Sequence, residues 1–372
     1  MEKRKWADVL HIVSGKNQKD VQNPNGKYPI YGSGGKMGYA DEYLCEPGTT
    51  IVGRKGTINR PIYVDEPFWN IDTAFGVTPD GGLDSKYLFY FCVHFNFMPL
   101  DKSTGRPSLA KSDLLKIEMP VPSIDEQRRI VSRIEELFSE LDNSVSTLQK
   151  TKEQLTVYRQ AVLKEAFDSV KSVDEGARVK DVCNNIQVGI VIKPTQYYVE
   201  SDGVKAFRNA NVRRNHVDDN NWALISKEGH EKNKKSIVHT NDLVIARSGA
   251  NLGMAAVVPE KCEGYNAIDI VIAELNLKVV DPHYMAYYIN SPYGLHVVNE
   301  FQHGGAQGHL NVKEFGLLPL ILAPISEQKS VVSEIESRLS VCDSIEQTVD
   351  IALQQAEAMR QSILKQAFEG RL

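Results

Sequence analysis

Each of two short segments of the chain places an arginine in a predicted turn that ends at a glycine. Residues 51–56 read Ile-Val-Gly-Arg-Lys-Gly, and residues 244–249 read Val-Ile-Ala-Arg-Ser-Gly. In each segment an apolar run typical of a strand precedes the arginine, Arg54 or Arg247. A loop arginine can contact a phosphate, or it can donate two parallel hydrogen bonds to a guanine edge. The two segments therefore predict two similar surfaces for nucleic-acid contact.

Other polar residues in predicted loops have compatible chemistry. Lysine and arginine can reach phosphates, while asparagine and serine offer the donors and acceptors that base reading needs. The candidate DNA-binding residues are Lys36, Arg54, Lys55, Arg106, Arg208, Asn209, Asn211, Arg213, Arg247, Ser248 and Asn251. For any one of them, a solvated surface charge or a turn residue is an equally good interpretation. The glycine loop at residues 32–38 fits a tight turn at least as well as a DNA contact.

The charge balance limits how the chain can bind nucleic acid. Lysine and arginine number 43 against 48 aspartate and glutamate, so the formal net charge is −5. Bulk electrostatic attraction to phosphates is therefore excluded as the main driving force. The contact must be local or shared with a partner, and DNA binding by the isolated chain is expected to be weak and salt-sensitive.

A long repeated segment is the element best suited to position such loops. One copy runs from residue 126 to residue 167 and the other from 327 to 368, so both ends lie 201 residues apart. Before the first copy, Pro120 keeps the chain extended, and Ser123 with Glu126 matches a capping box. About 43 helical residues at roughly 1.5 Å each give a rod of about 65 Å. A repeat without insertions suggests that this length matters to the function.

The repeated segment has an apolar residue at every seventh position. A seven-residue period kept over four or more heptads favours a coiled coil over a helix packed on one globular core. The predicted seam residues are Ile134, Leu141, Leu148, Leu155, Val162, Ile335, Val349 and Ile363. An interleaved row, which includes Tyr158, Ile345 and Met359, is expected to complete the seam.

The remaining sequence reads as two mixed α/β regions of a globular protein. Hydrophobic residues make up 42% of the 372 residues, and no apolar run approaches the ~18 residues of a membrane span. The five cysteines are dispersed, which predicts reduced thiols and a cytoplasmic location. The nine histidines show no metal-ligand spacing, so no metal site is expected.

Several motifs together resemble a known family. Residues 120–127 follow the pattern Pro-x-Pro-x-x-x-Glu-Gln, residues 130–142 read Ile-Val-x-x-Ile-Glu-Glu-Leu-Phe-Ser-Glu-Leu-Asp, and residues 364–372 read Leu-Lys-Gln-Ala-Phe-Glu-Gly-Arg-Leu. This combination closely resembles the specificity (S) subunits of type I restriction-modification systems. The resemblance covers essentially the full length and includes residues 28–35 and 72–75.

The resemblance implies an α/β (α+β) fold in which two similar mixed α/β target-recognition domains are separated by two long helices that form an antiparallel coiled coil. The implied boundaries are 1–122 for the first target-recognition domain, 123–171 for the central helical spacer, 172–323 for the second domain and 324–372 for the C-terminal helical spacer. Each domain would read one half of a bipartite, interrupted site in double-stranded DNA, and the helices would set the spacing.

The same resemblance implies the partners. Two methyltransferase (M) subunits would dock on the helices, at exposed positions that include Glu135, Glu136 and Gln149, and restriction (R) subunits would join through the complex. The chain itself would bind no cofactor and catalyse no reaction, with S-adenosylmethionine held by the methyltransferase subunits. No membrane partner is expected.

Two other functions were weighed. Residues 290–293, Asn-Ser-Pro-Tyr, resemble the Asn-Pro-Pro-Tyr of amino-methyltransferases, but serine replaces the first proline and no S-adenosylmethionine-type glycine loop accompanies them. A stand-alone methyltransferase or nuclease is therefore disfavoured. A coiled-coil scaffold without a DNA role is disfavoured by the duplicated arginine loops.

Overall fold

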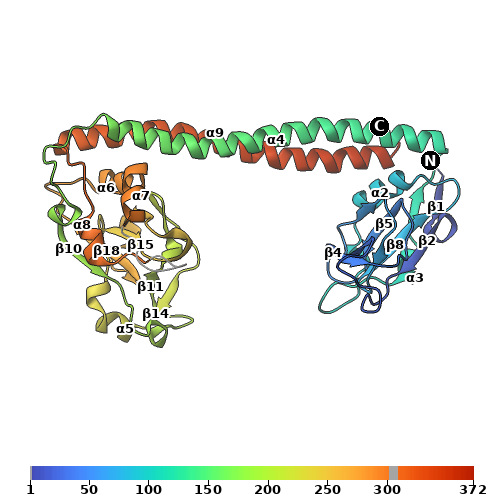
Figure 1. The fold of residues 1–372 in the computed structure, drawn as a ribbon, viewed down its shortest axis with the longest axis horizontal. Helices are drawn as coiled ribbons and strands as arrows, with labels where there is room; N and C mark the ends of the chain where they lie inside the picture. Colours follow the sequence, from blue (N-terminus) through green and yellow to red (C-terminus); the bar gives the residue numbers. More distant parts are fainter. Residues whose placement is uncertain (1, 301–308) are drawn as a thin grey trace. The chain divides into compact units, whose positions relative to one another are not determined.

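The computed structural model describes residues 2–300 and 309–372, and it divides into two compact units (Figure 1). Unit 1 combines Met1–Lys150 with Val349–Leu372, and unit 2 is Thr151–Thr348. Each unit thus contains one globular region and a segment of each long helix. These helices are α4, Ile124–Asp168, and α9, Ile325–Phe368. The mixed α/β class and the two long helices that the sequence predicts are confirmed.

Two sheets form the globular region of unit 1. The larger sheet is antiparallel with the strand order β2 (Leu10–Ser14), β8 (Ala74–Pro79), β5 (Thr49–Gly53) and β6 (Ile62–Val64). The smaller sheet has the order β4 (Gly35–Ala40), β3 (Tyr28–Gly32) and β7 (Trp69–Asn70). The other elements of this unit are β1 (Lys3–Lys5), which pairs with β9 (Glu118–Pro120), and the short helices α1 (Trp6–Val9), α2 (Ser85–His94), η1 (Met98–Leu100) and α3 (Lys111–Leu114).

Unit 2 repeats this topology with different residues. Its larger sheet has the order β10 (Cys183–Val188), β18 (Ile270–Leu275), β15 (Leu243–Ala246) and β16 (Ala255–Val257), and its smaller sheet has the order β14 (Ala223–Ile225), β11 (Val204–Phe207) and β17 (Asn266–Ala267). A hairpin of β12 (Val212–Arg213) and β13 (His216–Val217) is added. The helices are α5 (Lys227–Lys232), α6 (Pro282–Asn290), α7 (Pro292–Glu300) and α8 (Val312–Leu317), with 3-10 turns η2 (Val179–Val182), η3 (Pro194–Tyr197), η4 (Asn209–Asn211), η5 (Lys234–Ser236), η6 (Gly249–Asn251) and η7 (Glu260–Cys262).

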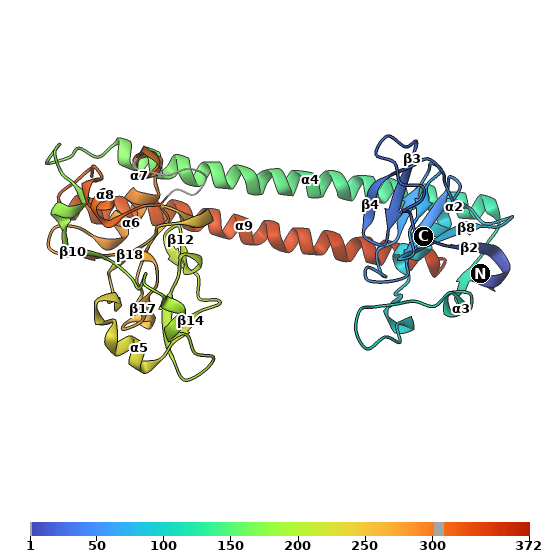
Figure 2. The same cartoon turned by 60° about the horizontal axis from the view of Figure 1, so that its bottom comes forward.

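In each unit a helix lies between the large sheet and the long-helix segments. Figures 1 and 2 show α2 in this place in unit 1 and α6 in unit 2. The buried core of unit 1 joins α2 to both long helices, through Ile134 of α4 and Leu364 of α9. The core of unit 2 joins α6 to Phe167 of α4 and Ile335 of α9 in the same way. The long helices are therefore part of both globular cores, in addition to packing on each other.

The two helix segments of unit 2 run antiparallel. Arg159 of α4 pairs with Glu346 of α9 at 2.9 Å, and Glu165 of α4 pairs with Arg338 of α9 at 2.8 Å. Residue numbers thus rise along one helix as they fall along the other. Arg159 also pairs with Asp343 at 2.7 Å.

The helix segments of unit 1 show the same direction. Arg129 near the start of α4 donates to the carbonyl oxygen of Leu372 at 3.3 Å, while Asp142 farther along α4 pairs with Arg360 of α9. The Asp142–Arg360 pair repeats the Asp343–Arg159 pair of unit 2, since both of its residues are 201 positions from their counterparts. Such exposed pairs contribute little stability, but they indicate equivalent helix registers in the two units.

Burial separates the predicted seam into two rows. Of the eight predicted seam residues, six are buried, and Leu148 and Ile363 are partly buried. The interleaved row was predicted to be buried as well, and this is wrong for Tyr158, Ile345 and Met359, which are 46%, 41% and 53% exposed. These exposed apolar residues therefore remain available to a partner.

Ser123 caps the first helix, as its sequence predicts. Its Oγ accepts a hydrogen bond from the N–H of Glu126 at 3.4 Å. The predicted return contact from the Glu126 carboxylate is replaced by an ion pair with Arg129 at 2.7 Å. An acidic side chain in the first turn still favours the helix N-terminus, and its ion pair with Arg129 holds the pKa of Glu126 below its ordinary value.

Candidate nucleic-acid interface

The Arg54 loop of unit 1 is held on both sides by backbone hydrogen bonds. The N–H groups of Arg54 and Lys55 donate to the carbonyl of Thr73 at 2.8 and 3.1 Å. The carbonyl of Arg54 accepts from the N–H of Leu109 at 2.8 Å, and the N–H of Gly56 donates to Pro107 at 2.8 Å. The loop is therefore fixed between two other segments, and its side chains project from a rigid backbone.

The strand before this loop needs glycine at its end. A Cβ on Gly53 would lie 1.9 Å from the carbonyl oxygen of Thr57, so the tight return of the chain excludes any side chain there. Gly56 has φ +84°, and the guanidinium of Arg106 lies directly over it. Glycines at both positions thus allow the arginine loop to close and bring Arg106 beside it.

The predicted site residues of unit 1 gather at one surface. Arg54 is half-buried with its guanidinium 5.7 Å from the ring centre of Phe75, while Lys55 and Arg106 are exposed. The Oγ of Ser33, in the turn between β3 and β4, donates to the carbonyl of Lys55 at 2.8 Å, so that hairpin adjoins the same loop. A hollow of about 550 Å³ beside Arg54 is also lined by Lys102, Ser103, Ser108 and Lys111.

Lys36 lies on the strand that leaves this hairpin turn. Gly32 pairs with Gly35 in the register, so the glycine loop is a tight turn, as one of its two interpretations predicts. The Lys36 ammonium donates to the Tyr39 hydroxyl at 3.0 Å and lies 4.2 Å from the ring centre. This hydrogen bond raises the pKa of Lys36, which keeps the exposed ammonium protonated and suited to a phosphate contact.

The Arg247 loop of unit 2 has the same construction. The N–H of Leu310 donates to the carbonyl of Arg247 at 3.0 Å, as Leu109 does to Arg54. The N–H of Arg247 donates to the side-chain oxygen of Asn209 at 2.9 Å. The Asn209 amide nitrogen in turn donates to the hydroxyl of Ser248 at 3.0 Å and the carbonyl of Asp269 at 3.2 Å. Asn209 and Ser248, predicted as DNA-contacting, are thus engaged in holding the loop.

Arg247 itself is more enclosed than Arg54. Its side chain is only 12% exposed, it lies 3.4 Å from the Asp269 carboxylate and it contacts the His309 ring. Its Nε is buried without a hydrogen-bond partner. A base contact by Arg247 would require the side chain to leave Asp269, so Arg247 is better placed to orient the loop than to read DNA directly.

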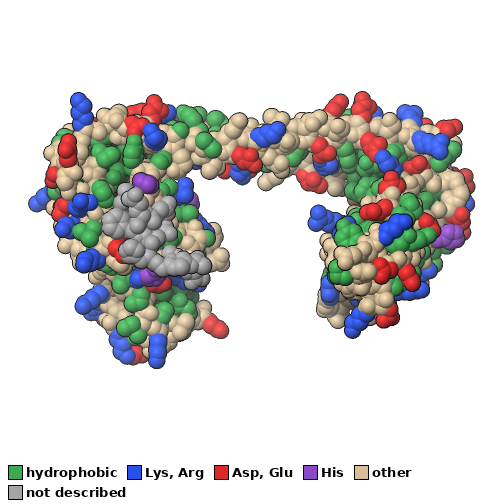
Figure 3. All heavy atoms as spheres, viewed as in Figure 1, with side chains coloured by type: hydrophobic (Ala, Val, Ile, Leu, Met, Phe, Trp, Pro, Cys, Tyr) green, Lys and Arg blue, Asp and Glu red, His purple; other side chains and the backbone are tan. Residues whose placement is uncertain are grey.

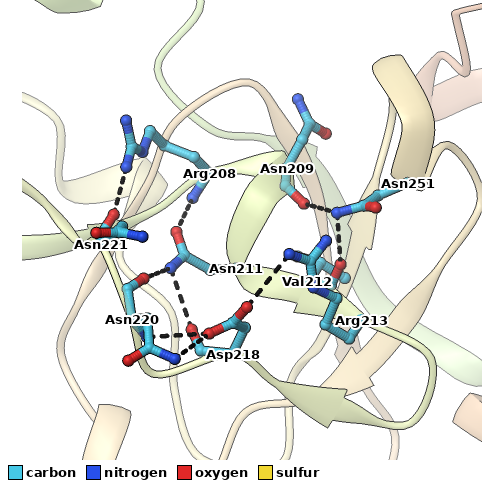
Figure 4. A network of polar contacts seen from close by, with 9 residues as sticks. All are labelled: Arg208, Asn209, Asn211, Val212, Arg213, Asp218, Asn220, Asn221 and Asn251. Atoms are coloured by element: carbon cyan, nitrogen blue, oxygen red, sulfur yellow. Dashed lines mark hydrogen bonds and ion pairs between the residues drawn. The ribbon is translucent and has the colours of Figure 1, made fainter. Parts of the chain in front are cut away.

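Figure 4 shows the network beside this loop. Asn211 is fully buried, its Oδ1 accepts from the N–H of Arg208 at 3.0 Å, and its Nδ2 donates to the carbonyls of Asp218 and Asn220 at 3.1 and 2.9 Å. Every group of its amide is thus engaged in holding the loop, while the DNA contact by Asn211 stays a prediction. Asn251 Nδ2 donates to the carbonyls of Asn209 and Val212, which limits it similarly.

Two arginines of this network remain partly accessible. Arg208 donates to the carbonyl of Asn221, and Arg213 pairs with Asp218 at 3.2 Å. Hydrogen bonds from Asn220, and then from Arg213, hold the pKa of Asp218 below its usual range. Asp218 therefore stays ionised and keeps Arg213 in place. No sequence signal marks this acceptor, because the turn at residues 218–220 reads as an ordinary polar loop.

Charges of both signs are mixed over each unit. In the view of Figure 3, Lys and Arg side chains alternate with Asp and Glu, without a continuous basic face on the surface shown. Nucleic-acid contact would therefore depend on the local groups described above.

Comparison with known proteins places these features in a family. The family model described as "Type I restriction modification DNA specificity domain" matches residues 1–156. The EcoBI specificity subunit of Escherichia coli is 25% identical over 357 residues, which cover 89% of this chain and 75% of the relative. The EcoKI specificity subunit of Escherichia coli K12 is 26% identical and covers 86% and 73%. Residues 1–156 thus match a type I restriction-modification DNA specificity domain, and most of the chain is similar to specificity subunits of that system.

Two solved structures share the fold of this chain. A chain in a structure concerning complex assembly and conformational transition of the type I R-M system matches with a TM-score of 0.74 at 15% identity, covering 100% of this chain and 98% of that one. The HsdS subunit from Thermoanaerobacter tengcongensis matches with a TM-score of 0.54 at 15% identity and covers 100% and 97%.

The methyltransferase-like tetrapeptide, residues 290–293, has a structural role in unit 2. Asn290 is fully buried, and its Nδ2 donates to the side chain of Asn215 at 2.7 Å and to the carbonyls of Ala255 and Ala286, both at 2.8 Å. Its Oδ1 accepts from the N–H of Ala255 at 3.1 Å. The amide thus ties the end of α6 to β16 and to the β12–β13 turn.

Two general properties were examined over residues 2–300 and 309–372. In these ranges no three His, Cys, Asp or Glu side chains come together as a possible metal site. Among the same residues, no helix combines the length and apolar character needed to cross a bilayer.

Proposed function

We propose that this specificity subunit gives a type I restriction-modification complex its DNA sequence preference, with each globular region reading one half of a bipartite, interrupted site. Residues 1–122 and 172–323 would be the target-recognition domains, and residues 123–171 and 324–372 the helical spacers. The observation that carries the proposal is the repeated loop, since Arg54 and Arg247 occupy the same place in two sheets of identical strand order.

The candidate contacts differ between the two domains. In the first domain, Arg54, Lys55 and Arg106 share one surface, with Lys36 on the adjoining hairpin, so they suit a phosphate-and-base contact. In the second domain Arg208 and Arg213 are the better candidates, while Asn209, Asn211, Arg247, Ser248 and Asn251 shape the loop that presents them. A good bidentate arginine contact to guanine contributes about 1–3 kcal/mol of discrimination against another base.

If each domain reads its own half-site, a substitution in one domain should alter the sequence preference of that half alone. In the complex with its methyltransferase subunits, Arg54→Ala should relax or change the preference in one half of the methylated site, by about 1–3 kcal/mol at the affected position. The other half and the gap should be unchanged. Genome-wide methylation mapping measures this directly.

An arginine elsewhere in unit 1 supplies the control. Arg129 is exposed and pairs with Glu126 on α4, so Arg129→Ala removes the same charge without touching the loop. Its methylated site should equal that of the wild type. Simultaneous changes in both halves with Arg54→Ala, or methyl transfer by the purified chain alone, would contradict the proposal.

We further propose that two methyltransferase subunits dock on the long helices and hold S-adenosylmethionine, that restriction subunits join through the complex, and that the assembly works in the cytoplasm. The chain would bind no cofactor and catalyse no step itself.

The docking of two methyltransferase subunits is supported by Tyr158 and Met359, which are exposed apolar residues 201 positions apart. Equivalent faces on two equivalent helices suit two copies of one partner. Nearby positions are polar: Glu135 and Glu136 are ion-paired with Lys86 and Arg133, and Gln149 is exposed.

Docking on equivalent faces predicts a stepwise loss of partners. Tyr158→Glu or Met359→Glu should each reduce the complex from two methyltransferase subunits to one, because a charge on the apolar contact opposes burial. Native mass spectrometry of the co-purified complex gives the ratio. Lys19→Glu, an exposed change in the first globular region, should leave the ratio at two to one. Retention of both subunits by each Glu variant would refute this docking face.

A further inference from the structure

A glutamine in the first turn of α4 is buried completely and uses its whole amide group. Gln127 is 0% exposed. Its Oε1 accepts from the N–H of Asp84 at 2.8 Å. Its Nε2 donates to the carbonyls of Gly82 at 2.9 Å and Pro122 at 2.8 Å. One side chain therefore joins the start of α4 to the loop that begins α2.

The first turn of α9 contains the same arrangement. Gln328 is also 0% exposed. Its Oε1 accepts from the N–H of Asp281 at 2.8 Å, and its Nε2 donates to the carbonyls of Val279 at 2.9 Å and Ala323 at 2.7 Å. Each of the three distances agrees with its counterpart in unit 1 to within 0.1 Å.

Both glutamines attach to a part of the globular region that is itself fixed. Asp84 is the N-cap of α2 and accepts from the N–H groups of Lys86 and Tyr87. Asp281 is the N-cap of α6 and accepts from those of His283 and Tyr284 in the same way. Each glutamine therefore connects two helix N-termini, one in the globular region and one at the start of a long helix.

Directional bonds restrict this junction in a way that apolar contacts do not. The helix starts are also held by buried apolar residues such as Ile134 and Ile335, but hydrophobic contact is non-directional and resists separation more than small rotations. Hydrogen bonds weaken steeply away from linearity. Two of the three bonds from each planar amide cross to the globular region, and they oppose tilting of the helix against the domain.

A small tilt has a large effect at the end of a long helix. A helix of 45 residues at about 1.5 Å per residue is about 67 Å long, so a tilt of about 5° moves its far end by about 6 Å. Successive bases along one DNA strand are about 3.4 Å apart. Loss of angular control at one junction would thus displace one domain from its half-site by more than one base step.

We propose that Gln127 and Gln328 are positioning residues that fix the angle between each target-recognition domain and its helix, and so restrict the DNA gap that the complex accepts. This inference rests on the proposed function, because it assumes that the two domains read two half-sites. Under this proposal the two buried amides limit how far the DNA gap can vary, whereas the length of the helices sets its mean value.

The test compares gap preference in complexes of the full chain with its methyltransferase subunits. The double variant Gln127→Met, Gln328→Met keeps the side-chain length and removes all six hydrogen bonds. DNA is selected from a library in which both half-sites are constant and the gap varies in steps of one base pair. The preference of the wild type for its best gap over the neighbouring gaps should fall about tenfold in the variant, while the bases selected within the half-sites stay the same.

Two buried hydroxyl groups provide a control for general loosening. Thr49 donates to the carbonyl of Glu46 at 2.7 Å, and Ser291 donates to the carbonyl of Tyr288 at 2.7 Å. Each of these bonds lies within a single globular region and does not involve a long helix. The double control Thr49→Val, Ser291→Ala should keep the wild-type gap preference. All proteins are compared at the same temperature interval below their own melting temperatures.

The outcomes separate this inference from the proposed function. If the wild type selects no bipartite site, the proposed function fails. If the wild type selects one gap and the folded glutamine variant selects it with equal stringency, the amides do not set the angle. A control variant that broadens the gap as much as the glutamine variant would also overturn the inference, because precision would then follow stability alone.

Discussion

Alanine at Phe167 should lower the free energy of unfolding of unit 2 by about 3–5 kcal/mol, as should alanine at Phe368 for unit 1. Phe167 lies at the end of α4, is 1% exposed and meets the rings of Tyr284 and Tyr288 edge-on at 5.2 and 5.3 Å. Phe368 ends α9 and meets the rings of Tyr87 and Phe91 at 5.2 and 5.4 Å. Each substitution removes aromatic contacts and leaves a cavity where a helix end joins a globular core.

Hydrogen exchange followed by mass spectrometry distinguishes the two units. Phe167→Ala should increase exchange in the strands and helices of unit 2, and Phe368→Ala in those of unit 1, because local opening reports the stability of each cooperative region. Val157→Ala on α4 is the control, since Val157 is 71% exposed. A loss below about 1 kcal/mol for either phenylalanine, or equal effects on both units, would contradict the packing described here.

The long helices could be located from the sequence because their signals are local. Helical spacers were predicted at 123–171 and 324–372, and α4 and α9 occupy Ile124–Asp168 and Ile325–Phe368. A heptad period and a serine cap lie within a few residues of each other, so no distant contact is needed to recognise them. The partner of each apolar residue could not be predicted. Near the ends of the long helices, the heptad residues Ile134 and Ile335 pack into the cores that contain α2 and α6.

The pairing of strands that lie far apart in the chain could not be predicted from the sequence either. Strand β1 pairs with β9 across more than a hundred residues, although Lys3-Arg4-Lys5 has the composition of a solvated charge run. Three exposed residues carry no alternation that would mark a strand.

The two arginine loops could be located from the sequence more readily than the roles of their residues. A closing glycine identified both arginine loops, because the tight chain reversal after Arg54 and after Arg247 favours glycine. The asparagines were harder to interpret. An amide that can read adenine can equally satisfy loop carbonyls, as Asn211 does, and only burial distinguishes the two roles.

Lengthening both helices by one heptad should lengthen the DNA gap without changing the half-sites. The insertions belong between Leu148 and Leu155 in α4 and between Val349 and Ala356 in α9. The insertion point in α4 lies between Asp142 and Arg159, and the insertion point in α9 lies between Asp343 and Arg360. The ion pairs Asp142–Arg360 and Arg159–Asp343 therefore lie on opposite sides of the insertions, and both can still form. A seven-residue insertion in each helix also keeps the apolar row in register.

Seven residues add about 10 Å to the rod, or roughly three base pairs at ~3.4 Å per step. Three base pairs are also about a third of a DNA turn, so the lengthened complex is expected to bind its best site less tightly than the wild type. The measurement is therefore selection from a library of variable gaps, followed by sequencing of the selected DNA. An insertion in α4 alone is the control and should destabilise the helix pair, because the two apolar rows no longer match. If the folded double insertion selects the original gap, the helices do not determine the spacing, and the repeat of fixed length needs another explanation.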